Sequence, residues 1–176
     1  MYKRQFQGCA IYESTIINQI TFYYYNAQNE TARLVFRGYK TRPFSEWTLK
    51  LGSIPLTTQG KEVVIQFYTP EISNNRTFYT DSNGLEMQKR ILDHRDTWNF
   101  TTILNVTQNY YPINSAIAIK DVANGNQLTL MNTRSQGGSA LAEGTVELMH
   151  QRRLFFDDWR GVGLSLIHIS EPTRRS

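Results

Sequence analysis

Short runs of β-forming residues, separated by turn-forming residues, recur along nearly the whole chain. Residues 20–25 are aromatic or β-branched, and the run 33–36 ends in Val35 and Phe36. Residues 63–67 place apolar side chains at alternate positions between Gly60 and Pro70. Runs of this length bounded by Gly, Pro or Asn predict strands rather than helices. Because each resulting sheet has to bury one face against another layer, we expect an all-β fold, an antiparallel β-sandwich.

Two pairs of these runs are joined by turns that predict β-hairpins. In the first, Asp-Ser-Asn-Gly at 81–84 separates the runs 77–80 and 85–88. In the second, Asn-Gly-Asn at 124–126 separates two apolar runs. Asn and Gly suit both turns because they tolerate the positive φ that tight hairpin loops demand.

Two further segments have apolar residues at alternate positions. Residues 47–51 alternate Trp and Leu with polar side chains, as a half-buried strand does. The segment 140–154 admits two interpretations, a helix or a strand over 145–150. Gly144 weakens the helix, and the apolar spacing there fits a period of two better, so we favour the strand.

The length of the chain, 176 residues, suffices for one domain with a core of its own. We expect a single β-rich unit over residues 1–163, whose N-terminal third belongs to a neighbouring sheet. Residues 164–176 resemble a translated sequencing-library adaptor, so we exclude them as a non-native tail. The alternative is a natural apolar terminal strand.

Charge and hydropathy exclude two classes of partner. The 19 Lys and Arg residues exceed the 15 Asp and Glu residues by four and are scattered. Nucleic-acid binding would require them to gather on one face, so we expect none. No run approaches the roughly 18 apolar residues of a membrane span, and no apolar signal segment follows Met1.

The residues that commonly bind metals are isolated in the sequence. Cys9 is the single cysteine, and His94, His150 and His168 stand far apart. Zinc sites require several such ligands at short spacings, so we predict no metal site in this chain. We expect Cys9 to be a small buried hydrophobic residue.

Four Asn-X-Ser/Thr sequons exceed the number that composition alone would give, and each lies in or beside a predicted loop. N-linked glycans are added at such sequons in the secretory pathway. We therefore predict a secretory-pathway protein whose signal peptide lies outside this sequence. The predicted glycosylation sites are Asn29, Asn75, Asn99 and Asn105.

Four motifs occur in order along the chain: Phe-Tyr-Thr-Asp-Ser-Asn-Gly at 78–84, Asn-Tyr-Tyr-Pro-Ile-Asn at 109–114, Arg-Ser-Gln-Gly-Gly-Ser at 134–139 and Asp-Asp-Trp-Arg-Gly-Val-Gly at 157–163. Together they resemble the C-terminal region of glycoside hydrolase family 38, the retaining α-mannosidases, and within it the lysosomal type. The resemblance runs from about residue 46 to residue 163.

This resemblance implies a part of the family's C-terminal region, a galactose mutarotase-like supersandwich. It implies a longer enzyme that removes terminal α-linked mannose from glycans through a glycosyl-enzyme intermediate, in a lysosome or vacuole. In the family, the nucleophile and a zinc ion lie in an N-terminal α/β barrel that is absent here. The resemblance therefore implies no catalytic residue and no metal ligand in this chain. The implied partners are that barrel and mannose-containing glycans.

The Asp-Asp-Trp-Arg segment carries the candidate substrate contacts. In the family, the matching arginine reaches the mannose pocket, so Arg160 is the candidate for lining it, with Asp158 beside it. A guanidinium can hold sugar hydroxyls without being consumed; the alternative for Arg160 is a plain salt bridge. Asp157 and Asp158 cannot both face one substrate, because neighbours on an extended chain point in opposite directions. A turn in which their carboxylates accept backbone N–H bonds is the structural alternative.

The motif 134–139 has no following helix and no Gly-Lys-Ser/Thr ending, so it does not predict a phosphate site. We expect a structural loop in which Gly137 and Gly138 allow close backbone approach.

Two other functions remain open at this point. One is a stand-alone carbohydrate-binding sandwich without catalytic activity, for which Trp98, Tyr110 and Tyr111 would supply an aromatic platform. The other is a structural interaction domain with a large apolar face.

Overall fold

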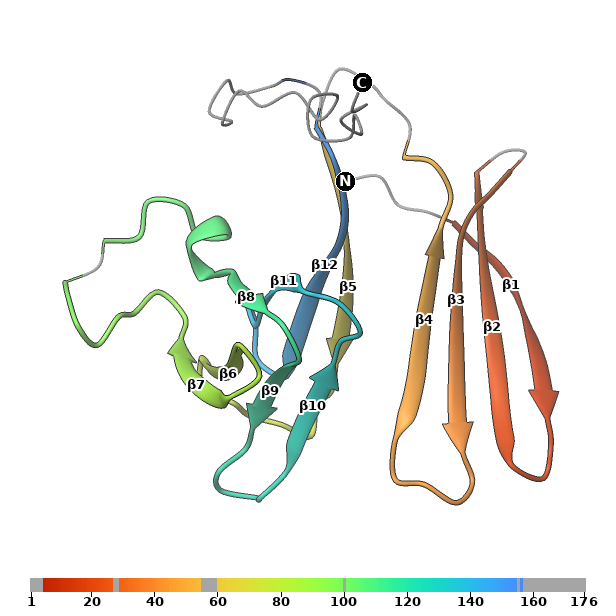
Figure 1. Ribbon diagram of the computed structural model, residues 1–176, viewed down its shortest axis with the longest axis horizontal. Coiled ribbons are helices and arrows are strands. Elements are labelled where there is room, and N and C mark those ends of the chain that lie inside the picture. Colours follow the sequence, from red (N-terminus) through yellow and green to blue (C-terminus); the bar gives the residue numbers. More distant parts are fainter. Residues whose placement is uncertain (1–4, 27–28, 55–59, 100, 155, 157–176) are drawn as a thin grey trace, which may run out of the picture. The chain divides into compact units, whose positions relative to one another are not determined.

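The computed structural model describes residues 5–26, 29–54, 60–99, 101–154 and 156. The described part is all-β and antiparallel, apart from one short 3-10 helix, as the sequence predicted. The chain divides into two compact units, residues 1–57 and 58–176, which are described separately (Figure 1). The predicted boundary at residue 163 lies outside the described residues and stays a prediction.

The N-terminal unit is a four-stranded antiparallel meander in which each strand pairs with the next. Its strands are β1 (Gln5–Glu13), β2 (Ile17–Asn26), β3 (Asn29–Tyr39) and β4 (Ser45–Leu51). Aromatic residues pair across it: Phe36 of β3 lies opposite Trp47 of β4, with their ring centroids 4.8 Å apart. Such cross-strand pairs stabilise a sheet beyond its backbone hydrogen bonds.

The prediction of a strand over 47–51 is confirmed, and Leu49 and Leu51 are half-buried. The prediction for Cys9 is wrong, because its side chain is exposed. The physical reason is its position: Cys9 lies in β1, which is an edge strand of a sheet that has no second layer among the described residues of this unit. Cysteine's general preference for interiors cannot bury a side chain where the topology provides nothing to cover it.

The C-terminal unit is a sandwich of two four-stranded antiparallel sheets (Figure 1). The first sheet has the order β10-β9-β6-β7, with β6 (Thr77–Ser82), β7 (Glu86–Ile91), β9 (Ala116–Lys120) and β10 (Gln127–Met131). The second has the order β5-β12-β11-β8, with β5 (Lys61–Tyr68), β8 (Tyr111–Ile113), β11 (Gln136–Ser139) and β12 (Thr145–Arg153). The 3-10 helix η1 (Thr107–Asn109) precedes β8.

The core lies between these two sheets. The first sheet contributes Phe78, Ile117 and Ile119, which are fully buried, and the second contributes Ile113 and Val146, also fully buried. Burying side chains of this size is worth about 1.5 to 3 kcal/mol each relative to leaving them exposed. The alternating apolar pattern that predicted the strands therefore also identifies the face that closes the sandwich.

Both predicted hairpins are confirmed. Residues 83–85 connect β6 to β7, with Asn83 at φ 52° and Gly84 at φ 72°. The turn containing Gly125, at φ 74°, connects β9 to β10. The helix considered for 140–154 is wrong, because β12 occupies most of that segment and pairs with β5 along its length.

The expected loop over 134–139 is wrong from residue 136 onward. Gln136–Ser139 forms β11, an inner strand between β12 and β8. The predicted close approach of the backbone at the glycines is confirmed, but it occurs in the core. A Cβ on Gly138 would lie 1.9 Å from Cδ1 of Ile113. The glycines thus let an inner strand lie tightly against neighbouring side chains, a positional use of glycine that loop statistics do not capture.

Candidate functional site

The predicted pocket-lining residues, Arg160 and Asp158, lie outside the described residues, as do Asp157 and His168. Their roles stay predictions. The tail 164–176 also lies outside the described part of the chain. What the structure does describe is how the other three motifs are held together.

A single carboxylate joins two of these motifs. Oδ1 of Asp81, in β6, accepts hydrogen bonds from the backbone N–H groups of Asn114, Ser115 and Ala116 at 2.8, 3.0 and 3.2 Å. Its Oδ2 accepts the N–H of Gly84 at 2.8 Å. Asp81 therefore closes its own hairpin loop and fixes that loop to the connection between β8 and β9.

The four donors also determine the charge of Asp81. Burial raises the pKa of this carboxyl, but the backbone hydrogen bonds from Ser115, Ala116, Gly84 and Asn114 outweigh that effect and lower the pKa to about 2. Asp81 is therefore an ionised acceptor with its lone pairs occupied, and only 5% of its surface is exposed. Such a group holds structure and cannot act as a general acid near neutral pH.

The third motif is tied to the second by buried polar contacts. The hydroxyl of Ser139, in β11, donates to the carbonyl oxygen of Asn109 at 2.8 Å, and both residues are fully buried. The side-chain amide of Asn109 donates to Oδ1 of Asp93 at 2.8 Å and to the carbonyl oxygen of Asn105 at 2.8 Å. The second motif is therefore hydrogen-bonded to the first through Asp81 and, separately, to the third through Ser139.

The tyrosines considered as a sugar platform are already engaged. The hydroxyl of Tyr110 donates to Oε1 of Glu147, and burial, followed by this contact, raises the pKa of Tyr110. The guanidinium carbons of Arg90 and Arg95 lie 4.3 and 5.1 Å from the ring centroid of Tyr111. Cation–π contacts of this kind cover the aromatic face that a sugar would need. Trp98 is 59% exposed.

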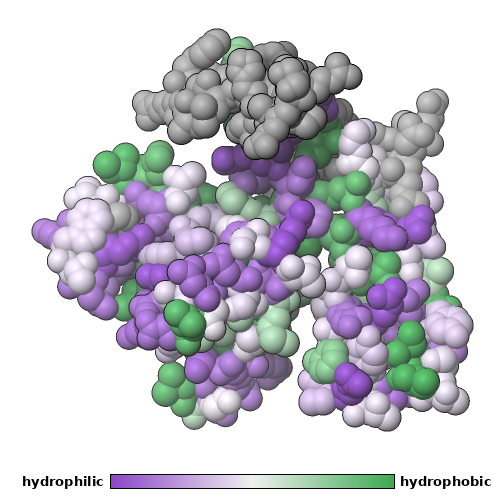
Figure 2. All heavy atoms as spheres, viewed as in Figure 1, coloured by the Kyte–Doolittle hydropathy of each residue, from purple (hydrophilic) through white to green (hydrophobic). Residues whose placement is uncertain are grey.

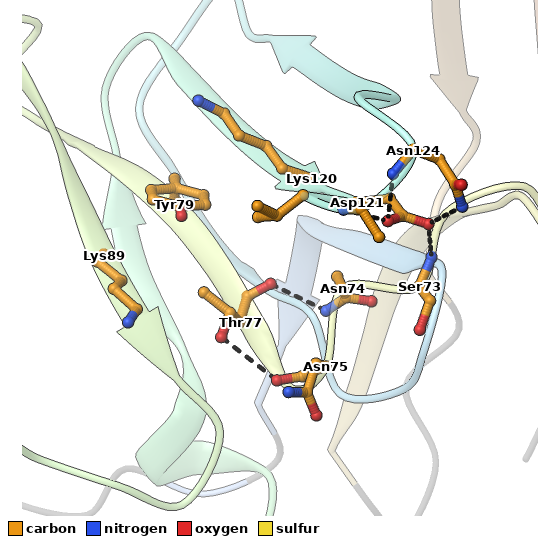
Figure 3. A pocket seen from close by; sticks show the side chains of 11 residues that line it. Ser73, Asn74, Asn75, Thr77, Tyr79, Lys89, Lys120, Asp121 and Asn124 are labelled. Atoms are coloured by element: carbon orange, nitrogen blue, oxygen red, sulfur yellow. Dashed lines mark hydrogen bonds between the residues drawn. The ribbon is translucent and has the colours of Figure 1, made fainter.

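A polar groove lies on the sheet that contains β6 (Figure 3). Its volume is about 470 Å³, and it is lined by residues 73–75, Thr77, Tyr79, Lys89 and residues 120–124. We call it the Tyr79 groove. The Nζ atom of Lys120 lies 5.0 Å from the ring centroid of Tyr79. Lys89 is the cross-strand partner of Tyr79, so the two side chains are on the same face of the sheet.

The acidic residue in this groove is fully bonded. Oδ1 of Asp121 accepts the N–H groups of Ala123 and Asn124 at 3.0 and 3.1 Å. Its Oδ2 accepts the side-chain amide of Asn124 at 2.9 Å and the N–H of Ser73 at 3.3 Å. The Asn124 side chain, followed by these backbone donors, lowers the pKa of Asp121. The groove can therefore offer ligands ammonium groups, amides, hydroxyls and an aromatic ring, but no free carboxylate nucleophile from Asp121.

The two histidines whose positions are described, His94 and His150, do not converge on a metal site. Nε2 of His94 contacts Oδ1 of Asp96 at 2.9 Å in an exposed pair. Burial, and then the charge of Arg134, lower the pKa of His150. Among the residues with described positions, no three His, Cys, Asp or Glu side chains come together to hold a metal ion.

Three of the predicted glycosylation sites are exposed: Asn75, Asn99 and Asn105. Asn29 is the first residue of β3, and its side chain lies outside the described part. The visible face of the sandwich in Figure 2 is mostly polar, with scattered hydrophobic groups. In the described segments, no helix is long and apolar enough to cross a membrane.

The comparisons with known proteins agree with this arrangement. A model of the glycosyl hydrolases family 38 C-terminal domain matches residues 6–160. The lysosomal alpha-mannosidases of Homo sapiens and Felis catus are 49% and 48% identical over 124 residues, which is 69% of this chain and 12% of either protein. The lysosomal alpha-mannosidase of Dictyostelium discoideum is 34% identical over 163 residues, which is 92% of this chain and 16% of that protein. The chain thus spans less than a fifth of the length of these curated relatives.

Proposed function

The chain belongs to glycosyl hydrolase family 38, and on that premise we propose that it is the C-terminal β-rich part of a longer α-mannosidase. The parent enzyme removes terminal α-linked mannose from glycoprotein glycans with retention of configuration. The relatives named lysosomal alpha-mannosidase support a lysosomal or vacuolar setting. The sequons independently predicted a secretory-pathway protein.

In this proposal, the role of the chain is to hold loops in place for chemistry performed elsewhere in the parent. The observation that carries it is the Asp81 network. The carboxylate oxygens of Asp81 are buried and accept hydrogen bonds from four backbone N–H groups, so Asp81 has a structural role. Retaining glycosidases need two carboxylates about 5 Å apart on either side of the sugar, one of them free to attack. Neither Asp81 nor Asp121 is free in that sense.

Zinc, the cofactor expected for the family, does not fit the described residues, since they contain no cluster of three ligands. We propose that the parent enzyme binds zinc in its N-terminal barrel, so no step of the reaction is assigned here to a metal. The proposed partners of this chain are that barrel and the mannose-containing glycans that enter its pocket.

Arg160, with Asp158 beside it, is the proposed contribution to the pocket. A guanidinium presents a rigid planar fork of donors, which suits it to bridging two sugar hydroxyls. Lysine at the same position would keep the charge but lose the fork. Comparing Arg160→Lys with Arg160→Ala in the full-length enzyme therefore separates the effect of the planar fork from that of the charge.

The test compares the 176-residue chain with the full-length product of the same locus, using 4-nitrophenyl α-mannoside as the substrate. We expect the chain alone to be inactive and the full-length enzyme to lose activity to a chelator and regain it with zinc. In the full-length enzyme, Arg160→Ala should lower kcat/KM by roughly tenfold to a hundredfold, the loss of about 1.4 to 2.8 kcal/mol of transition-state binding. Hydrolysis by the chain alone at a rate that a chelator does not change would overturn the proposal.

A further inference from the structure

The Asn75 sequon lies on a rigid turn. Asn75 and Arg76 have φ values of 45° and 59°, and the N–H of Thr77 donates to the carbonyl oxygen of Asn74 at 2.9 Å. This is a turn with two left-handed residues at its centre. The carboxylate of Glu143 fixes it by accepting the backbone N–H groups of Asn74, Asn75 and Arg76 at 2.9, 3.1 and 3.0 Å. Three successive amides around one anion form a nest.

The two neighbouring asparagines of this turn differ in the use of their side chains. Asn74 is 3% exposed; its amide donates to the carbonyl oxygen of Thr77 at 2.9 Å, and its Oδ1 accepts the N–H of Gly144 at 2.9 Å. Asn75 is exposed, and within the described residues its side-chain amide makes no hydrogen bond. The side chain of Asn74 is thus buried, whereas that of Asn75 is exposed to solvent on a turn whose backbone is held by Glu143.

The Tyr79 groove starts at this amide. Asn75, Thr77 and Tyr79 all line it, and Figure 3 shows them following one another from the turn into β6. Alternate residues of a strand share a face, so Thr77 and Tyr79 are on the same side of the sheet. Four residues of extended chain span roughly 13 Å, which limits the separation of Asn75 and Tyr79 to the reach of a few linked sugars.

We propose that an N-linked glycan on Asn75 lies along the Tyr79 groove. Its inner N-acetylglucosamine residues pack against Thr77 and Tyr79, while Lys89 and Lys120 donate hydrogen bonds to their hydroxyl and acetyl oxygens. An ammonium group has three donors and no acceptor, so it matches these oxygens. Because the glycan is covalently attached beside the groove, weak contacts suffice to seat it: its effective concentration there is high.

The attachment itself requires a lipid-linked pyrophosphate oligosaccharide as the donor. A new bond forms between Nδ2 of Asn75 and C1 of the first sugar. The bond between C1 and the pyrophosphate oxygen breaks, and the lipid pyrophosphate leaves with the electron pair. The amide loses one proton. The sequon Asn75-Arg76-Thr77 is the acceptor that this transfer requires.

The experiment uses the 176-residue chain, secreted from yeast behind an added signal peptide so that it carries high-mannose glycans. Glycopeptide mass spectrometry measures occupancy at Asn75 and the rate at which endoglycosidase H, which cuts between the first two sugars, releases the glycan from the native protein. We expect Asn75 to be occupied. We expect release to be about tenfold faster in Tyr79→Ser and in Lys120→Ser than in the unsubstituted chain.

Matched controls are Tyr12→Ser and Lys50→Ser, which remove the same residue types from exposed positions in the N-terminal unit. They should leave the release rate unchanged, and denaturation should make all rates equal. Circular dichroism checks that each variant is folded. If Tyr79→Ser does not fold, Lys120→Ser still tests the proposal. An unoccupied Asn75, or equal native release rates in the unsubstituted chain and Lys120→Ser, would overturn the proposal. The readout is glycan release, so its result is independent of mannosidase activity.

Discussion

In the sandwich, Phe78, Ile117 and Val146 are fully buried, whereas in the N-terminal sheet Phe6, Ile11 and Tyr12 leave 53, 67 and 58% of their surface exposed. Both units are antiparallel, and their strands carry similar apolar and aromatic residues. What differs is the second layer. A sheet that lies against another sheet removes its apolar face from water, and that burial is the largest favourable contribution to folding.

The sandwich differs from the N-terminal sheet in its polar residues as well. Asp81, Asn109 and Ser139 are buried, and their hydrogen bonds connect residues 33, 16 and 30 positions apart. In the N-terminal sheet, Arg37 and Glu46 form an exposed ion pair at 3.8 Å between neighbouring strands. Exposed pairs of this kind contribute little, whereas removing one partner of a buried network leaves unsatisfied donors behind. The same substitution should therefore cost more in the sandwich.

The largest effect is expected from Asp81→Ala. It leaves the N–H groups of Gly84, Asn114, Ser115 and Ala116 without their acceptor. We expect the free energy of unfolding to fall by about 3 kcal/mol. Urea denaturation followed by tryptophan fluorescence and circular dichroism measures it. A loss below 0.5 kcal/mol, within the range of ordinary surface changes, would contradict the assigned role.

The same carboxylate gives the protein a pH dependence. Its pKa is about 2 in the folded state against 3.8 ordinarily, so its stabilising contribution is present above pH 4 and is lost as the pH falls through about 2. Asp81→Asn, which cannot ionise, should flatten the stability profile between pH 4 and pH 2. A profile in that window as steep as that of the unsubstituted chain would argue against Asp81 as its source.

A smaller loss is expected from Gly138→Ala in β11. The added Cβ would lie 1.9 Å from Cδ1 of Ile113 and 3.2 Å from Cδ2 of Leu148, so the core has to shift. We expect a loss of about 1 to 3 kcal/mol, the usual result of overpacking. Gly8→Ala is the matched control in the N-terminal sheet, because nothing lies within 4 Å of its new Cβ. Equal losses for both variants would remove the distinction between the two units.

A still smaller loss is expected from Glu143→Gln. The neutral side chain keeps the shape but weakens three hydrogen bonds to the amides of residues 74–76, for a loss of about 1 kcal/mol. Glu46→Gln in the N-terminal sheet is its control, since it removes a charge from an exposed pair and should change stability by less than about 0.5 kcal/mol. Thermal unfolding of both variants side by side measures the difference. A larger loss from Glu46→Gln would reverse the comparison.

The sequence predicts features that depend on neighbouring residues. The hairpin at 81–84 follows from Asn83 and Gly84, whose positive φ values are what that turn requires. The alternation of residues 63–67 predicts both the strand and its half-buried face. Such signals need no knowledge of the rest of the fold.

Features that depend on distant residues were missed. By themselves, Gly137 and Gly138 favour a loop. Their place in a strand depends on packing against Ile113, which is more than 20 residues away in the sequence. Asp81 has the local signature of a turn residue, but its bonds to residues 114–116 appear once the two segments are brought together. The Tyr79 groove likewise combines β6, β7 and β9, so the sequence identified the Asn75 sequon but not the surface beside it.

Amide hydrogen exchange on the intact 176-residue chain tests most directly whether the sandwich is the stable centre of the molecule. We expect the slowest-exchanging amides in β6, β9 and β12, around Phe78, Ile117 and Val146, with β1 to β4 exchanging about a hundredfold faster through local opening. Slowest exchange in the N-terminal sheet, or equal protection of both units, would contradict the account.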